Sequence, residues 1–447
     1  MKHNNLLIDK LFPITTSVNA DDTLTIGNLN IHELARKFGT PLYIYDYETI
    51  KKIYNDFYNA FEMQYGEVDI LYASKVFLNL PFAKLLHKLG VKFDVVSHGE
   101  MSMLIAAKIG LENAYFHGNN KTVEELGLAI KNNIGAIVID NIEEIQIINE
   151  IAKNINIKQN VLVRVTPNID PFTHEKTTTG LKDSKFGLSI EDRSAEDAIS
   201  LISESSNISF RGIHAHLGSP INITDPYVKA IDKMFSFIKN ICLDKYSLNV
   251  SEFSPGGGFG VVSEPDMDTP TIEEFAIAIS NAIKFNCKKY GIDLPKMFIE
   301  PGRSLLARSA VSVYKVGTRK EIPNVRTYVS VDGGMADNIR PTLYDAKYYA
   351  IPVKDVFRKP VDIVTISVKY CESGDYLIKD IHLPKLTRDE LIAMPMSGAY
   401  QLAMASNYNL AYKPAVILVH NNKSTLIRRR ESISDIISLD EDIINIP

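Results

Sequence analysis

Short runs of β-branched and aromatic residues alternate with longer segments of helical period between about residues 69 and 300. Eight runs are expected to form strands: 69–73, 92–96, 114–117, 136–139, 161–165, 208–214, 252–254 and 296–299. Strands that alternate with helices form βα units and a parallel sheet. Because eight such units close a barrel, the pattern predicts an α/β fold of the (β/α)8 TIM type.

Residues that typically end helices lie between the predicted strands, in agreement with this count. The amphipathic segments NLPFAKLLHKLG and EMSMLIAAKIG end at Gly90 and Gly110, and a glycine at that place is typical of a helix C-terminus. A long polar loop at 167–187 precedes a predicted helix at 194–203. Loops of this length in compact domains are usually functional or disordered.

The pattern of hydrophobic and polar residues changes outside residues 69–300. Residues 306–447 hold short alternating segments such as VSVYKVG and DIVTISVKY, which predict a mostly antiparallel β domain. The first 45 residues contain a strand, a helix and a strand that could extend it. We therefore expect a barrel at 46–305 and a β domain built from 1–45 and 306–447.

Composition narrows the class of protein. The chain has 447 residues, 45% hydrophobic and 23% charged, with a net charge of -5, so no basic surface suits nucleic acid. Cys242, Cys287 and Cys371 are too few for a disulfide framework and lack metal-ligand spacing. No apolar run is long enough for a signal peptide or a membrane span. A cytoplasmic protein without a metal site or membrane contact is expected.

Polar residues follow most of the predicted strands, and the active site of such a barrel forms at these strand ends. They are Lys75, His117 to Asn120, Arg164, His214, His216, Gly256 to Gly258, Glu300 and Arg303. The glycine run SPGGGFG and the EPGR segment follow strands seven and eight, where barrels commonly bind phosphate. Alone, the glycines would indicate only a tight turn.

Each candidate has a plainer interpretation. A lysine is usually exposed on the surface, but at the mouth of a barrel partial desolvation would give Lys75 a neutral amine able to condense with an aldehyde. His214 and His216 could be structural histidines. Cys371 alone is typical of a buried cysteine, but the neighbouring acidic residues in CESGD favour a function.

Ten motifs in order carry a resemblance that covers nearly the whole chain. They are YASK (72–75), HGNNK (117–121), TTGLKDSKFG (178–187), GIHAHLGS (212–219), GGGFG (256–260), EPGR (300–303), DGGMADNIRPTLY (332–344), CESGD (371–375), GAY (398–400) and SNYN (406–409). With them the chain resembles the barrel-fold, alanine-racemase-like pyridoxal-phosphate decarboxylases, and within these the diaminopimelate decarboxylases.

The resemblance implies pyridoxal 5'-phosphate as cofactor. In that family's pattern Lys75 forms the Schiff base, His216 stacks on the ring, and Glu300 faces the pyridine nitrogen and keeps it protonated. The phosphate end is held by Gly256, Gly257, Gly258, Arg303 and Tyr400, and Ser219, Pro301 and Gly302 complete the cofactor contacts.

The resemblance also implies a substrate and an assembly. Arg303, Arg340, Tyr344, Glu372 and Tyr400 match the family's substrate contacts, and their mixed charges suit an amino acid at both ends. The expected reaction is decarboxylation of meso-2,6-diaminopimelate to L-lysine and CO2, the last step of lysine biosynthesis. Cys371 matches the family's proton donor, which reaches the site from the partner subunit, so a homodimer with shared active sites is expected.

Departures from the family pattern are few. Ala215 and Pro220 stand where Cys and Gln are usual, and Val76 and Phe77 where Ala and Asn are usual. Two other readings remain: a sister decarboxylase for a D-amino acid or a carrier-linked amino acid, and a catalytically inactive binding homologue. A racemase shares the barrel, but CESGD and the distal arginines argue against one.

Overall fold

The computed structural model of the chain describes residues 2–171, 179–181 and 183–441. It divides into two compact units. The first consists of Met1–Lys51, Val262–Met267 and Leu306–Pro447, and the second of Lys52–Val261 and Asp268–Leu305. Each unit has a sheet and a core of its own.

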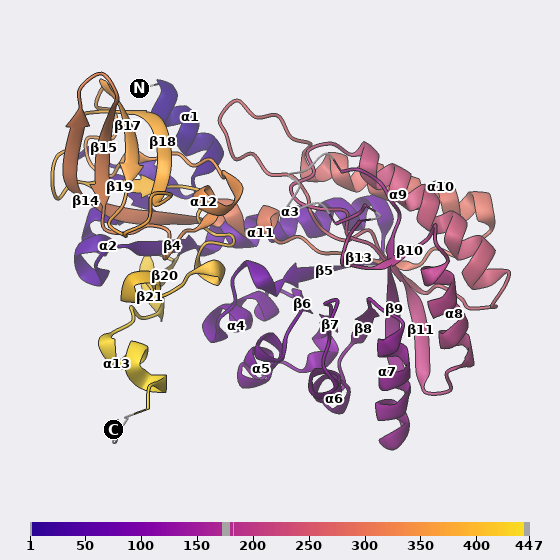
Figure 1. The fold of residues 1–447 in the computed structure, drawn as a ribbon. Coiled ribbons are helices and arrows are strands. Elements are labelled where there is room, and N and C mark those ends of the chain that lie inside the picture. The colour runs from indigo at the N-terminus through magenta and orange to yellow at the C-terminus, as the bar shows by residue number, and fades with distance from the viewer. Residues whose placement is uncertain (1, 172–178, 182, 442–447) are drawn as a thin grey trace. The chain divides into compact units, whose positions relative to one another are not determined.

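The second unit is a closed parallel barrel (Figure 1). Its strands are β5 (Val68–Ala73), β6 (Lys92–Val95), β7 (Ala114–Phe116), β8 (Ala136–Ile139), β9 (Gln159–Thr166), β11 (Ile208–His214), β12 (Glu252–Ser254) and β13 (Lys296–Ile299). Neighbours pair in parallel all the way round, because β13 pairs with β5 and β8 pairs with β9. The short β10 (Leu188–Ser189) extends the sheet beside β9. The predicted fold class is confirmed, and all eight strand predictions lie within two residues of the observed bounds.

Helices follow the strands on the outside of the barrel (Figure 1). They are α4 (Leu80–Lys88), α5 (His98–Ala106), α6 (Val123–Lys131), α7 (Glu143–Asn154), α8 (Ser194–Glu204), α9 (Asp225–Phe237) and α10 (Ile272–Tyr290). Local sequence sets their beginnings: Thr122 with Glu125 and Thr271 with Glu274 form capping boxes, which pair backbone N–H groups that a helix start leaves free. The predicted helix at 194–203 is α8.

The two glycines that were expected to end helices behave differently. Gly90 has φ +93°, and its N–H donates to the carbonyl of His87 just after α4, as predicted. The expectation for Gly110 is wrong. Lys108 takes the left-handed conformation after α5, with φ +61°, and Gly110 precedes the short 3-10 helix η2 (Leu111–Asn113) with an extended backbone.

Apolar side chains fill the barrel. One buried cluster combines residues of β5, β7, β8, β9 and β13, namely Leu71, Tyr115, Ala136, Val138, Leu162 and Phe298. Burial of such side chains supplies the main driving force for folding. The packed interior makes the barrel a solid core, so the chemistry is confined to the strand ends.

The first unit is mostly antiparallel, as predicted. Its sheet runs in the order β18 (Tyr376–Leu383), β17 (Asp362–Ser367), β15 (Arg326–Val331), β14 (Ala310–Ile322), β4 (Leu42–Asp46), β20 (Ala415–His420) and β21 (Lys423–Arg428). The strand β19 (Leu391–Met394) also pairs with β14. The N-terminal segment contributes β4, which pairs antiparallel with β14 and parallel with β20. A first helix, α1 (Lys2–Leu11), was not predicted.

None of the helices in the described part of the chain is long and apolar enough to cross a membrane.

Candidate active site

Six polar side chains from different strands meet inside the barrel at its carboxyl end. Asp94 lies in β6, Arg164 in β9, His214 and Ser254 end β11 and β12, and His117 and Glu300 directly follow β7 and β13. All six are buried, with at most 8% of each residue exposed. Because buried polar groups must be paired, their shared location marks this end of the barrel as the candidate site.

Glu300 is the centre of this group. His214 Nε2 lies 3.0 Å from its carboxylate, and the Ser254 hydroxyl donates to Oε1 at 3.3 Å. His117 Nε2 is 3.7 Å away. Burial by itself would raise the pKa of Glu300, but His214 and His117 outweigh this effect and hold the pKa below its usual value. Glu300 is therefore a buried carboxylate that keeps its charge.

His117 and Asp94 show the opposite effect of burial. Burial lowers the pKa of His117 well below its usual value, and it raises the pKa of Asp94 even though Lys75 opposes that rise. His117 Nε2 and Asp94 Oδ1 are 3.8 Å apart, and neither atom has a hydrogen-bond partner among the described residues. Polar atoms left in this state at a barrel mouth are available to a ligand.

Lys75 lies in a one-turn 3-10 helix, η1 (Ser74–Val76), immediately after β5. Its charge acts on Asp94, His117 and His216, so the amine belongs to this group. One expectation is wrong, however: the Lys75 side chain is exposed, because η1 carries it past the end of the buried strand.

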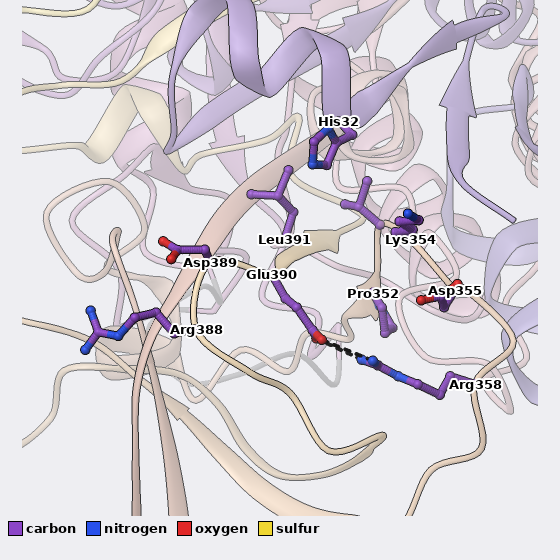
Figure 2. A pocket seen from close by; sticks show the side chains of 10 residues that line it. His32, Pro352, Lys354, Asp355, Arg358, Arg388, Asp389, Glu390 and Leu391 are labelled. Carbon is purple, nitrogen blue, oxygen red and sulfur yellow. Dashed lines mark hydrogen bonds and ion pairs between the residues drawn. The ribbon is translucent and has the colours of Figure 1, made fainter. Parts of the chain in front are cut away.

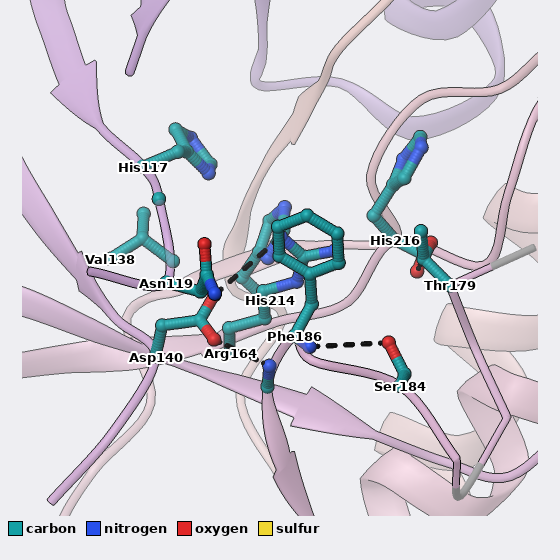
Figure 3. A network of polar contacts seen from close by, with 12 residues as sticks. His117, Asn119, Val138, Asp140, Arg164, Thr179, Ser184, Phe186, His214 and His216 are labelled. Carbon is teal, nitrogen blue, oxygen red and sulfur yellow. Dashed lines mark hydrogen bonds and ion pairs between the residues drawn. The ribbon is translucent and has the colours of Figure 1, made fainter. Parts of the chain in front are cut away.

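His216 is oriented by the glycine loop. The Gly257 N–H donates to His216 Nδ1 at 3.2 Å, and the Thr179 hydroxyl donates to the His216 carbonyl at 2.8 Å. Desolvation by the surrounding protein, together with Lys75 and Arg164, lowers the pKa of His216 well below its usual value. Its partly exposed ring is therefore neutral and held in place, which suits stacking on a flat ligand (Figure 3).

The glycine loop after β12 requires glycine at three successive positions. A Cβ at Gly256, Gly257 or Gly258 would collide with the backbone carbonyl of Ala215, Glu300 or Gly218, respectively. Gly256 and Gly258 also have φ of +81° and +94°. The Ile221 N–H donates to the Gly258 carbonyl at 2.8 Å, which brings the segment containing Ser219 beside this loop. Glycine-rich loops that follow the last strands of such a barrel commonly bind phosphate.

A second network lies beside His214 (Figure 3). Arg164 is 3.6 Å from Asp140 and lies 4.6 Å from the centre of the Phe186 ring, while Asp140 accepts the Gly187 N–H at 2.6 Å. These contacts hold the end of the predicted loop 167–187 against the strand ends. Residues 172–178 and 182, including Thr178 of the TTGLKDSKFG motif, lie outside the described residues.

The first unit brings three other predicted residues together. The Arg340 guanidinium, at the start of α12 (Arg340–Tyr344), lies 5.2 Å from the Tyr344 ring centre and 5.4 Å from that of Tyr400. Arg340 is 7% exposed, and Tyr400 takes φ +62°. A guanidinium between two phenol rings is preorganised for a carboxylate.

Cys371 and Glu372 lie on a neighbouring loop of the same unit. The Cys371 N–H donates to Asn409 Oδ1 at 3.2 Å, and the Tyr408 hydroxyl donates to the Cys371 carbonyl at 3.4 Å. The Thr342 hydroxyl donates to the Gly374 carbonyl at 2.7 Å, which ties the loop to α12. Unlike the buried Cys242 and Cys287, Cys371 is exposed, contrary to what a cysteine read alone suggests.

A cavity of about 280 Å³ lies in the first unit, between β19 and the segment after β16 (Ile351–Pro352) (Figure 2). It is lined mainly by charged side chains, and Arg358 and Glu390 pair through two hydrogen bonds of 3.1 and 2.8 Å. None of the motif residues lines it, so we do not assign the chemistry to this cavity.

Comparisons with known proteins identify the family of the chain. Residues 48–307 match the family model of the pyridoxal-dependent decarboxylase, pyridoxal binding domain. The diaminopimelate decarboxylase of Bacillus methanolicus is 40% identical over 93% of this chain and 96% of its own, and that of Bacillus subtilis is 40% identical over 95% and 97%. The crystal structure of diaminopimelate decarboxylase from M. jannaschii in complex with L-lysine superposes with a TM-score of 0.90 at 35% identity, covering 97% of this chain and 99% of that one.

The barrel and the matched domain define a pyridoxal-dependent carboxy-lyase. With these relatives spanning nearly its whole length, the chain belongs to the diaminopimelate decarboxylase family. The cofactor is pyridoxal 5'-phosphate, and the residues present fit it: a charged buried carboxylate, a neutral imidazole and a loop that only glycine can form, at the strand end where such barrels bind phosphate.

Sequence reasoning missed part of the site. Asp94, Asp140 and Ser254 were not singled out, although each lies at or near the carboxyl end of a strand, the same signal that found Lys75. Their short side chains in apolar runs such as KFDVV and GAIVID were the available clue.

Proposed function

We propose that the chain decarboxylates meso-2,6-diaminopimelate to L-lysine and CO2, the last step of lysine biosynthesis. The observation that carries this proposal is the buried, charged Glu300 at the strand ends of a pyridoxal-binding barrel. Pyridoxal 5'-phosphate, when bound, supplies an electron sink for the pair released from the breaking C–C bond. The chain's own residues bind the cofactor and the substrate, orient them and supply the proton that the product gains.

The barrel residues divide the work of holding the cofactor. Lys75 would provide the amine that holds its aldehyde carbon, and Glu300 would accept a hydrogen bond from the pyridine N–H and so favour the charged form of that nitrogen. His216 would lie against the ring, because the Gly257 N–H holds its Nδ1 and the Thr179 hydroxyl holds its backbone carbonyl. Gly256, Gly257, Gly258, Arg303 and Tyr400 would hold the phosphate end, and Ser219, Pro301 and Gly302 would complete the cofactor contacts. The neutral state of His216 avoids placing a second cation beside Lys75.

The first unit supplies substrate selection. Arg340, Tyr344 and Tyr400, with Arg303 of the barrel, bind the distal carboxylate, and Glu372 binds the distal ammonium. The contacts between the Arg340 guanidinium and the two rings support this role, because they hold a cation of the kind that binds a carboxylate in a defined place. The lysine bound in the M. jannaschii relative has the form of the expected product.

Cys371 donates the proton that replaces the lost CO2, from its Sγ to the substrate carbon. It does so in the barrel of a second copy, in a homodimer with shared sites. The exposure of Cys371 supports this assembly, as does the apolar surface beside it. This surface contains Tyr408, whose hydroxyl donates to the Cys371 carbonyl, together with Leu410 and Tyr412. The three residues are 37%, 65% and 44% exposed. Such a patch is suited to an interface.

In this account the barrel, 46–305, holds the cofactor, and the β domain, 1–45 and 306–447, contributes substrate and dimer contacts. The protein works in the cytoplasm, without nucleic acid, metal or membrane partners. Three free cysteines, one of them exposed, are consistent with a reducing compartment.

The test is a substrate comparison with the cofactor-loaded protein. Meso-diaminopimelate, L-ornithine, L-lysine and D-amino acids are supplied in parallel, and CO2 and the amine product are measured. We expect CO2 and L-lysine in equal amounts from meso-diaminopimelate alone. Turnover of another amino acid instead would favour a sister decarboxylase. Absence of turnover with every substrate would favour the catalytically inactive binding homologue.

A further inference from the structure

The Glu300 carboxylate is enclosed by the ends of several other strands. His214, Ser254 and His117 approach it from β11, β12 and the end of β7, and these residues are 1%, 0% and 5% exposed. Glu300 itself is 6% exposed. A carboxylate buried this deeply tends to take up a proton, unless its neighbours favour the charged form. The enclosure therefore decides whether Glu300 can face a protonated pyridine nitrogen.

We infer that His214 is a positioning residue, whose Nε2–H fixes the orientation of the Glu300 carboxylate and keeps it ionised. The inference rests on the proposed function and deepens it, since it says what prepares Glu300 for the cofactor. From the sequence alone, His214 could equally have been a structural histidine.

The geometry of His214 is suited to this role. Its Nε2 is 3.0 Å from the carboxylate, whereas its Nδ1 has no hydrogen-bond partner among the described residues. Because an ionised carboxylate only accepts hydrogen bonds, the ring atom that faces Glu300 must be the donor, so Nε2 carries a proton. The His117 ring meets the His214 ring edge-on, with centroids 4.9 Å apart and planes at 68°, which limits rotation of His214.

Charged and titratable groups face Glu300 from four elements. His214 and His117 lower the pKa of Glu300, while its burial and Asp94 of β6 raise it. Arg164 of β9 interacts favourably with Glu300, and Lys75 does so with Asp94. Loss of His214 would remove the closest of the favourable contacts and leave burial and Asp94 to act. The pKa of Glu300 would then rise, and its charge would be lost at a higher pH.

The test uses two substitutions in the cofactor-loaded enzyme. His214→Leu keeps most of the volume without a donor, and His214→Gln offers an amide N–H close to the position of Nε2. Two quantities are followed against pH: kcat/KM for meso-diaminopimelate, and the visible absorption of the bound cofactor, which responds to the charge at its pyridine nitrogen. A His420→Leu variant is the matched control, because His420 contacts Glu48 at the same 3.0 Å in the other unit.

We expect His214→Leu to lose roughly tenfold to hundredfold in kcat/KM near neutral pH, as a charge-assisted hydrogen bond in the site would give. The acidic limb of its pH profile and its absorption change should both move to higher pH. His214→Gln should recover most of the rate and return the limb toward wild type, and His420→Leu should match wild type throughout.

Two results would overturn the inference. One is a wild-type profile for His214→Leu. The other is an equal loss at every pH in both variants, with no shift of the limb, which indicates a structural role only. If the wild type does not decarboxylate meso-diaminopimelate, the proposed substrate fails, but the absorption titration still tests His214. Thermal unfolding of each variant identifies any protein that has failed to fold.

Discussion

Asp375 Oδ1 accepts a hydrogen bond from the backbone N–H of Met335 at 2.8 Å, across 40 residues of sequence. Its second oxygen accepts the N–H of Tyr370 at 2.9 Å. One buried carboxylate thus fastens the loop of Cys371 to the segment that leads into Arg340. The proposed proton donor and the proposed substrate arginine are therefore held by the same side chain.

Removal of this carboxylate should loosen both segments. Asp375→Ala leaves two backbone N–H groups without their acceptor, so we expect a loss of about 2 kcal/mol in stability and a lower kcat. Asp375→Asn keeps one acceptor oxygen and should lose less. Urea unfolding and steady-state kinetics measure the two effects. Wild-type stability in Asp375→Ala would show that the loop is held by its other contacts.

The glycine loop offers a test of cofactor binding. In Gly257→Ala the new methyl group would collide with the Glu300 carbonyl, so the loop must move and pyridoxal phosphate should bind at least tenfold more weakly, a change of about 1.4 kcal/mol. Gly127→Ala is the control, because a Cβ there meets nothing within 4 Å and helix α6 favours alanine. Equal cofactor affinity in both variants, measured by titration of the apoprotein, would contradict the proposed phosphate site.

Asp337 should make the stability of the first unit depend on pH. Burial raises its pKa from 3.8 to about 6, although Tyr314, the Gly334 N–H and Tyr43 oppose the rise. Between about pH 4 and pH 6 the folded state then binds more protons than the unfolded state, so stability falls as the pH rises. The fall should amount to roughly 3 kcal/mol, at about 1.4 kcal/mol per pKa unit.

Asp337→Asn does not titrate and should lack this fall. Unfolding by urea at several pH values, compared between the wild type and the variant, measures the difference. A constant difference between the two proteins from pH 4 to pH 6 would mean that Asp337 is ionised throughout the range.

The sequence predicted the barrel well because its signals are local. Each strand is a short apolar run, and Lys75, His216 and Glu300 could be found as residues directly behind such runs. Periodicity also predicted that residues before the barrel join the β domain, which they do through β4.

Contacts between distant segments were beyond such reasoning. His214 and Glu300 are 86 residues apart, and Tyr43 contacts Asp337 across 294 residues. Nothing in the local pattern distinguishes a histidine that packs from one that orients a carboxylate. The exposure of Lys75 and Cys371 could not be predicted either, because it depends on the path of a turn and of a loop, and tertiary structure sets that path.

Mixing two inactive variants tests the shared site. Lys75→Ala lacks the cofactor lysine and Cys371→Ala lacks the proton donor, so each homodimer should be nearly inactive. If the two residues act from different subunits, a mixed dimer has one intact site, and mixing should restore up to about a quarter of the wild-type rate under random exchange. Absence of any recovery, with exchange verified by differently tagged subunits, would contradict the shared site.

The central claim is that this barrel holds pyridoxal phosphate on Lys75, and chemical reduction tests it most directly. Borohydride converts the bond between cofactor and lysine into a stable amine, and peptide mapping by mass spectrometry then identifies the labelled residue. We predict a single label on Lys75, in the peptide containing YASK, and its loss in Lys75→Ala. A label on any other lysine, or none on the active protein, would contradict the account.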